Sequence, residues 1–61
     1  MSEAEVLWTV QDVSGFLRVP VATIYQWRVR SEGPPAMRIG RHLRFDPATV
    51  RQWSRDQLEA G

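Results

Sequence analysis

Apolar residues near the start of the chain repeat with the period of an amphipathic helix. They fall at i, i+3, i+6 and i+7 within "TVQDVSGFL" and are Val10, Val13, Phe16 and Leu17. We expect this stripe to face the core. Thr9 precedes it as an N-cap, and Asp12 three residues later completes a capping box with a shorter acid than usual. Trp8, just before the cap, is placed to pack onto Val13 as a hydrophobic staple.

A second helical pattern follows after a short interruption at "RVP". Pro20 disfavours the α conformation at Val19 but suits the first turn of a new helix. The run "VATIYQWRVRS", residues 21–31, places Ile24 and Trp27 inward at i, i+3. It ends before "EGPP", whose glycine and prolines exclude helix. Helix, three-residue turn and helix is the spacing of the helix-turn-helix unit.

After residue 35 the apolar period changes from 3.6 to 2, which predicts a short β-hairpin over "AMRIGRHLRF". We expect Arg38 and Arg44 on its outer face and Gly40 in the tight turn, where positive φ is needed. The other face is expected to pack on Trp27 and Trp53. That apolar face comprises Met37, Ile39, Leu43 and Phe45.

A third helix is predicted over "DPATVRQWSRDQL", with Asp46 as N-cap and Pro47 at the first helical position. The core positions predicted on it are Val50, Trp53 and either Gln57 or Leu58. The expected fold is therefore mainly α with a small β-hairpin, in the order α-α-β-β-α. We expect one domain over residues 8–58, with a flexible N-terminal tail at 1–7 and a C-terminal tail at 59–61.

Charged residues are distributed unevenly along the chain, although the formal net charge is only +1. Residues 18–44 contain six arginines and one acid, whereas the rest of the chain contains two arginines and six acids. Segregated charge of this kind gives a small protein one positive face that attracts polyanions. All eight basic residues are arginine, whose planar fork suits phosphate and guanine, although arginine bias is equally explained by genomic base composition.

Several classes of function find no support in the 61 residues. The chain has one histidine and no cysteine, so it can assemble neither a zinc site nor a histidine-based triad. It lacks a phosphate-cradling glycine loop, and no segment approaches the roughly 20 apolar residues that cross a bilayer. We expect a cytoplasmic, nucleoid-associated protein that is not an enzyme and needs neither cofactor nor metal.

The tract from "TIYQW" through "PP" to "RIGRHLRF", closed by an aspartate-capped helix ending in tryptophan, resembles the MerR-like excisionase family. The resemblance covers about residues 8–55 and implies a winged helix-turn-helix. It further implies that the second helix enters the major groove of DNA and that the hairpin, or wing, reaches the flanking minor groove or its phosphates. This chain has Arg18 where the family usually has glycine in the turn. Either Arg18 adopts a left-handed conformation at some cost, or the turn differs.

By this resemblance, Gln26 lies at the groove floor together with Val21 and Ala22. Gln26 could pair with adenine, and either valine or alanine could pack on a thymine methyl group. Thr23 and Tyr25 are expected to donate to phosphates. Arg28 and Arg30 flank this face and either contact phosphates or remain solvated. Without the resemblance, Tyr25 and Gln26 would be ordinary surface positions of an amphipathic helix. The DNA-binding residues predicted on the second helix are Val21, Ala22, Thr23, Tyr25, Gln26, Arg28 and Arg30.

The wing is the second predicted contact. An arginine at its tip, Arg41, could enter a narrow, electronegative minor groove. Two alternatives to DNA contact remain for the wing arginines. They could form a charged strand edge that only prevents aggregation, or Arg38 could pair with an acid such as Asp46. The DNA-binding residues predicted on the wing are Arg38, Gly40, Arg41, His42 and Arg44.

The resemblance implies an excisionase, or recombination directionality factor, of a phage or mobile element. Copies would bind adjacent repeats on double-stranded DNA, bend it, and assist a tyrosine or serine integrase in excision. With the chain ending at Gly61 we expect no sensor domain. A small stand-alone transcriptional regulator is the alternative, and a module that binds an acidic protein is a third hypothesis.

Overall fold

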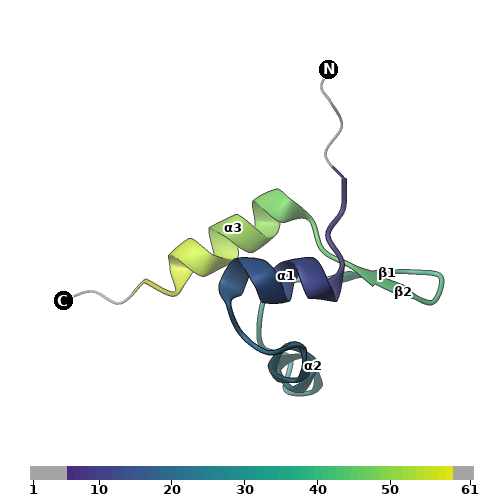
Figure 1. The fold of residues 1–61 in the computed structure, drawn as a ribbon, viewed down its shortest axis with the longest axis horizontal. Helices are drawn as coiled ribbons and strands as arrows, with labels where there is room; N and C mark the ends of the chain where they lie inside the picture. Colours follow the sequence, from purple (N-terminus) through teal and green to yellow (C-terminus); the bar gives the residue numbers. More distant parts are fainter. Residues whose placement is uncertain (1–5, 59–61) are drawn as a thin grey trace.

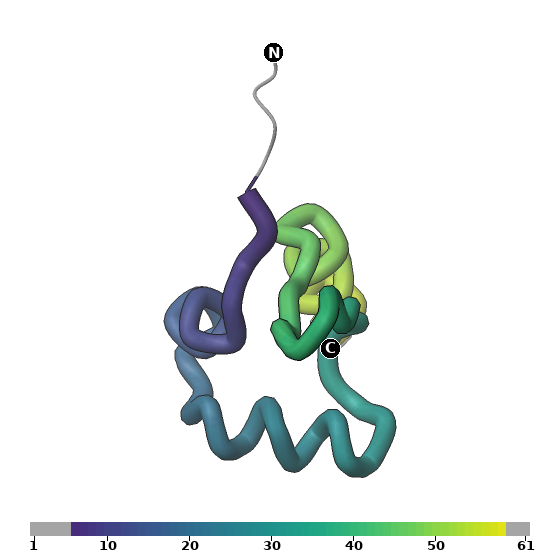
Figure 2. The backbone as a smooth tube through the Cα atoms, turned by 90° about the vertical axis from the view of Figure 1, so that its right-hand side faces the viewer, coloured from purple at the N-terminus to yellow at the C-terminus, as the bar shows by residue number. Residues whose placement is uncertain are grey.

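The computed structural model describes residues 6–58, so most of both predicted tails lies outside the described residues. Three helices and an antiparallel hairpin follow in the predicted order. They are α1 (Val10–Leu17), α2 (Val21–Val29), β1 (Met37–Ile39), β2 (His42–Arg44) and α3 (Pro47–Asp56). α1 and α3 lie side by side, α2 crosses beneath them, and the hairpin projects to one side (Figures 1 and 2). This is a winged helix-turn-helix.

The core draws one or two side chains from each helix and from the base of the hairpin. Phe45, directly after β2, is the largest fully buried residue and is 0% exposed. Val13, Ile24 and Val50 from the three helices are equally enclosed. A single small cluster therefore holds all the elements together, and it sets the position of α2 relative to the hairpin.

Local sequence signals explain where two of the helices begin. The Thr9 hydroxyl accepts from the Asp12 N–H at 3.1 Å, and the Asp12 carboxylate accepts from the Thr9 N–H at 2.9 Å, which confirms the capping box. Asp46 caps α3 by accepting from the backbone N–H of Thr49 at 3.0 Å and from its hydroxyl at 2.8 Å. Pro20 occupies the N-cap of α2, and its carbonyl accepts from the Thr23 N–H at 3.0 Å.

The turn between α1 and α2 contains a left-handed residue. Arg18 has φ 63° and ψ 41°, as the first of the two alternatives for this position predicts. Its N–H donates to the Ser14 carbonyl at 2.8 Å, and the Ser14 hydroxyl donates to the Val19 carbonyl at 2.6 Å. These bonds close the turn despite the strain that a side chain brings to this conformation.

The hairpin differs from the prediction in which residues share a face. Its turn consists of Gly40 and Arg41, and only Gly40, with φ 61°, belongs to the positive-φ residues, as in a type II′ turn. This two-residue turn fixes the register of the strands. The opposed pairs are Ile39 with His42, Arg38 with Leu43, and Met37 with Arg44.

Because opposed residues in an antiparallel pair point to the same side, the apolar residues of β1 and β2 lie on opposite faces. Met37 and Ile39 face outward and are 39% and 48% exposed, whereas Leu43 packs against the core. The prediction that all four apolar residues share one buried face was therefore wrong. Arg38, predicted to face outward with Arg44, lies instead on the same side as Leu43.

Two predictions about the core and one about the end of α2 were also wrong. Phe16 is 44% exposed and packs beside the Trp8 ring with centroids 5.2 Å apart, so the buried stripe of α1 is narrower than expected. Neither Gln57 nor Leu58 returns to the core, since both follow the end of α3 and Leu58 is 79% exposed. α2 ends at Val29, two residues before the predicted end.

Trp27 and Trp53 form a half-buried pair with ring centroids 5.6 Å apart. Gly33, with φ 83°, lies against this pair, and a β-carbon there would come within 3.0 Å of Trp27. The loop after α2 thus needs glycine for two reasons at once, its backbone conformation and its close approach to an aromatic ring.

Candidate nucleic-acid interface

The outer face of α2 carries the first group of predicted site residues. Ile24 points inward and is 1% exposed, so the opposite side of the helix faces solvent. The exposed positions on that side are Ala22, Tyr25, Gln26 and Val29. Val21, Thr23 and Arg28 are only half-exposed at its margins. Of the three residues predicted to lie at the groove floor, Ala22 and Gln26 are exposed and Val21 is only half-exposed.

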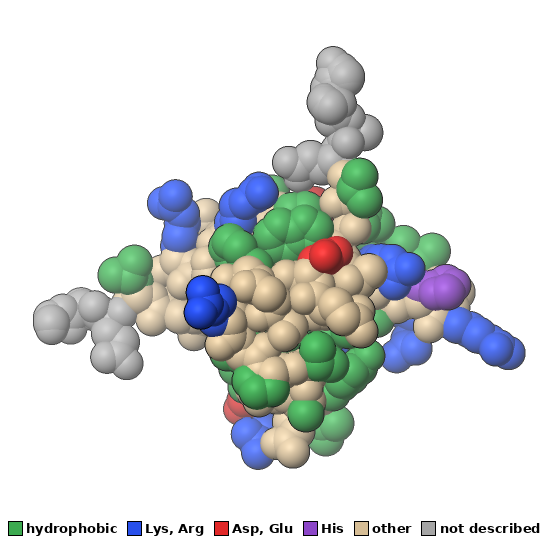
Figure 3. Space-filling view, viewed as in Figure 1, with side chains coloured by type: hydrophobic (Ala, Val, Ile, Leu, Met, Phe, Trp, Pro, Cys, Tyr) green, Lys and Arg blue, Asp and Glu red, His purple; other side chains and the backbone are tan. Residues whose placement is uncertain are grey.

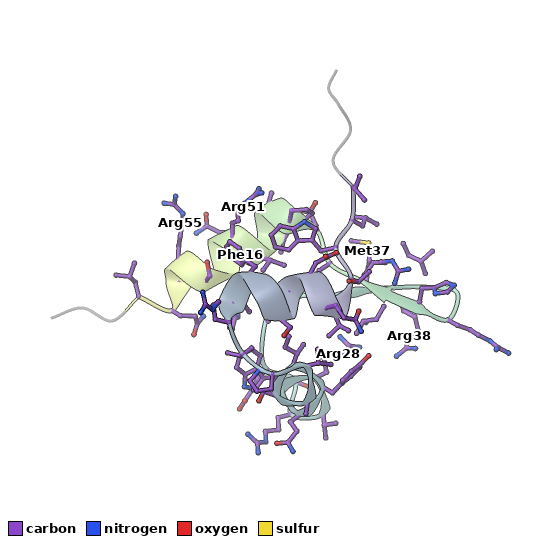
Figure 4. All side chains as sticks on the ribbon, in the orientation of Figure 1. Phe16, Arg28, Met37, Arg38, Arg51 and Arg55 are labelled. Carbon is purple, nitrogen blue, oxygen red and sulfur yellow. The ribbon has the colours of Figure 1, made fainter. Side chains whose placement is uncertain are left out.

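A hollow separates α2 from the hairpin, and its lining is basic and aromatic. The lining residues are Tyr25, Arg28, Val29, Arg38, Arg41 and Leu43. In Figure 4, Arg28 on α2 and Arg38 on the hairpin lie on the same side of the molecule, between the two elements. Two separate elements therefore bring cations to one recess, which suits contacts to DNA phosphates.

Arg38 reaches this recess because of the hairpin register. The two-residue turn places Arg38 opposite Leu43, on the side of the hairpin that turns toward α2. Arg38 and Asp46 do not form the alternative ion pair. The Oδ2 atom of Asp46 accepts both bonds from Thr49. Across residues 6–58 the ion pair within 4.0 Å is the one between Arg30 and Glu32, whose side chains are both more than half exposed. An exposed pair of this length contributes little.

The predicted wing residues divide into two groups. Arg41 at the tip is exposed and lines the hollow together with Arg38. His42 and Arg44 belong to the opposite face with Ile39 and Met37. Arg44 is half-buried, and its Nη1 donates to the carbonyl of Leu43 at 2.8 Å, which holds its guanidinium against its own strand.

Positive charge gathers at the hairpin, where blue and purple side chains crowd the right-hand end of the molecule in Figure 3. A second, smaller basic group lies on the opposite side from α2. There Arg51 and Arg55 extend from α3 (Figure 4), and the Arg51 guanidinium stands 5.5 Å from the Trp8 ring centroid. Sequence periodicity indicated neither the hollow nor this stack, because both arise from packing between distant segments.

Among the described residues, no three histidine, cysteine or acidic side chains come close enough together to hold a metal ion. None of the helices within residues 6–58 combines the length and the apolar character needed to span a bilayer.

A recognition helix flanked by a basic hairpin defines a class of protein, the winged helix-turn-helix DNA-binding domain. The comparison with protein families agrees with this class. A family model described as a helix-turn-helix domain matches residues 9–57, and the chain belongs to this family. Neither a curated protein nor a solved structure gives a significant match to the chain. The protein accordingly binds double-stranded DNA.

Proposed function

We propose that this protein is an excisionase that binds specific sites on duplex DNA and acts by occupancy and bending, without catalysis or a cofactor. The observation that carries the DNA-binding part of the proposal is the hollow between α2 and the hairpin. Because arginines from both elements line it, a DNA backbone seated there would leave α2 in the major groove and Arg41 over the flanking minor groove. Tyr25 lines the same recess, and its hydroxyl can donate a hydrogen bond to a phosphate oxygen.

The excisionase role rests on the resemblance of the tract from "TIYQW" to "RIGRHLRF". In this role several copies occupy adjacent repeats and bend the DNA between them. Bending a site costs a few kcal/mol, which contacts to neighbouring copies could offset. The bent array would then help an integrase to assemble the excisive complex.

The first experiment tests specific duplex binding. A site is selected from a random duplex pool, located on the DNA that flanks the gene by footprinting, and compared with a scrambled duplex over a range of salt concentrations. We expect tighter binding to the selected site and an affinity that falls steeply with salt. Equal and weak binding to both duplexes at low salt would refute DNA-site recognition and favour a module that binds an acidic protein.

The second experiment separates the excisionase from a transcriptional regulator. A circular-permutation assay measures bending of the footprinted DNA, and an in vitro reaction with a cognate integrase measures excision. We expect a bend and an increase in excision that depend on the protein. Site-specific binding with neither effect would contradict the excisionase role while leaving DNA recognition intact.

A further inference from the structure

Three residues form a straight, solvent-facing line along α2. Ala22, Gln26 and Val29 are spaced i, i+4 and i+7, which places them above one another on a helix. All three are exposed, and Val29 at 86% is the most exposed large apolar side chain among residues 6–58. We call these three residues the outer line of α2.

The outer line is uncharged, and the charges of the helix stand beside it. Arg28 lies on the flank that faces the hairpin, where it lines the hollow, and Val29 borders the same hollow from the end of the outer line. Arg30 lies on the other flank, next to Gln26 and Val29. Cations on both flanks suit the two phosphate strands that border a groove, and they leave the line between them to meet base edges.

The chemistry of the outer line restricts which bases it can read. In the major groove guanine is recognised by arginine or lysine, and the amino group of cytosine by aspartate or glutamate. The outer line has neither kind of side chain. Its alanine and valine suit the thymine methyl group, and its glutamine suits the paired donor and acceptor of adenine.

We propose that α2 recognises A·T base pairs, with Ala22 and Val29 each packed on a thymine methyl group and Gln26 bonded to an adenine between them. Seven residues of helix rise about 10 Å, which corresponds to about three base-pair steps of about 3.4 Å. The two methyl groups therefore lie about three steps apart. This inference rests on the proposed function, since it needs a specific duplex site.

The structure favours Val29 rather than Val21 as the second residue that contacts a thymine methyl group. Sequence left Val21 and Ala22 as equal candidates for a methyl contact and did not include Val29 in the site. Val21 is half-buried at the margin of the helix, so the second contact passes to Val29, two turns beyond Ala22. A residue that looked like plain helix surface thus becomes a specificity determinant.

The test uses deoxyuridine, which differs from thymidine only by lacking the C5 methyl group. Starting from the selected duplex, each thymine is replaced singly by deoxyuridine and the dissociation constant is measured at fixed salt. Burying one methyl-sized group at about 0.8 kcal/mol corresponds to about a four-fold loss of affinity. We expect such a loss at two thymines about three steps apart, and little change at the other thymines.

The Val29→Ala variant identifies which of the two thymines the Val29 side chain contacts. The variant should bind the thymine duplex a few-fold more weakly and lose the thymine-over-deoxyuridine preference at one position only. Val6→Ala is the matched control, because Val6 is 81% exposed on the segment before α1 and should leave both preferences intact. Circular dichroism confirms that each variant is folded, and a merely structural role for Val29 would not change a preference for one methyl group.

The results of these experiments test A·T recognition by α2 separately from the proposed function. If the protein selects a defined site but tolerates every deoxyuridine, or if the site contains only G·C pairs under α2, methyl recognition is wrong and site-specific binding stands. If Val29→Ala keeps both preferences, Val29 is not a determinant. If no sequence is preferred over a scrambled one, the proposed function itself fails.

Discussion

Trp8 and Phe45 exchange two backbone hydrogen bonds of 2.8 Å, one in each direction, as an isolated antiparallel bridge. The bridge joins the segment before α1 to the base of the hairpin. Phe45 also buries its side chain completely in the core, so the base of the wing is held by its backbone and its ring together. The orientation of the wing relative to α2 is thus set by the same residue that closes the core.

Phe45→Ala should unfold the domain. Removing a fully buried phenylalanine costs about 3–5 kcal/mol, which is comparable to the whole stability that a core of this size provides. Urea denaturation followed by circular dichroism measures the effect. Phe16→Ala is the control, since a ring that is 44% exposed should cost only about 1 kcal/mol, mainly through its contact with Trp8. Equal losses for the two variants would contradict the core described above.

Arg18→Gly should raise the free energy of unfolding by about 0.5–1 kcal/mol, because glycine relieves the cost of the left-handed conformation by more than it adds in chain entropy. Arg18→Ala removes the same charge but keeps the β-carbon, so it should bring no such gain. Thermal and urea unfolding of the three proteins compare them directly. If the alanine variant gained as much as the glycine variant, charge rather than φ 63° would explain the effect.

Two glycines should respond oppositely to alanine. Gly15 lies inside α1 with nothing within 4 Å of an added β-carbon, so Gly15→Ala should stabilise by about 0.5–1 kcal/mol through helix propensity. Gly33→Ala should destabilise by more than about 1 kcal/mol, because it combines φ 83° with a 3.0 Å approach to Trp27. Midpoints of urea unfolding decide the sign of each change.

Arg41→Ala should weaken binding to every duplex to a similar degree and lower the slope of log affinity against log salt by about 1. Arg38→Ala should act in the same way, because Arg38 lines the same hairpin wall of the hollow. Arg55→Ala removes an equal charge from α3, on the side away from α2 (Figure 4), and should leave the slope nearly unchanged. A slope unaltered by Arg41→Ala would place the wing tip in solvent.

Gln26→Ala should relax sequence preference more than it lowers affinity. The amide is the one hydrogen-bonding group on the outer line of α2, so its loss removes discrimination of about 1–3 kcal/mol at one base pair. Repeating the selection with the variant measures the change. An equal loss on all sequences would mean that Gln26 contacts phosphate rather than a base.

Local sequence signals predicted the order of elements and the caps at Thr9 and Asp46, whereas the left-handed turn at Arg18 was one of two alternatives raised by the family resemblance. Each depends on residues within four positions of one another, where spacing and side-chain chemistry are sufficient. The hairpin faces were assigned wrongly because alternation along one strand does not fix the register with the next. Counting across the two-residue turn would have placed Arg38 opposite Leu43.

The bridge between Trp8 and Phe45 and the hollow between α2 and the hairpin were not predictable in this way. Both depend on segments that meet only after the chain has folded, and no periodicity marks them. Phe16 shows that helical spacing alone does not predict which residues are buried. It has the spacing of a core residue, but so small a core is filled by Val10 and Val13 before the ring of Phe16 is reached.

The turn at Gly40 and Arg41 has one further consequence. Two residues joining paired strands leave the tip of the wing no spare length with which to adapt, and its base is anchored at Phe45. When the wing enters a groove as proposed, any mismatch in shape must therefore be accommodated by the DNA. Pyrimidine–purine steps such as TA and CA deform most readily, so in the proposed complex the stiffness of base pairs that no side chain touches would also contribute to site preference.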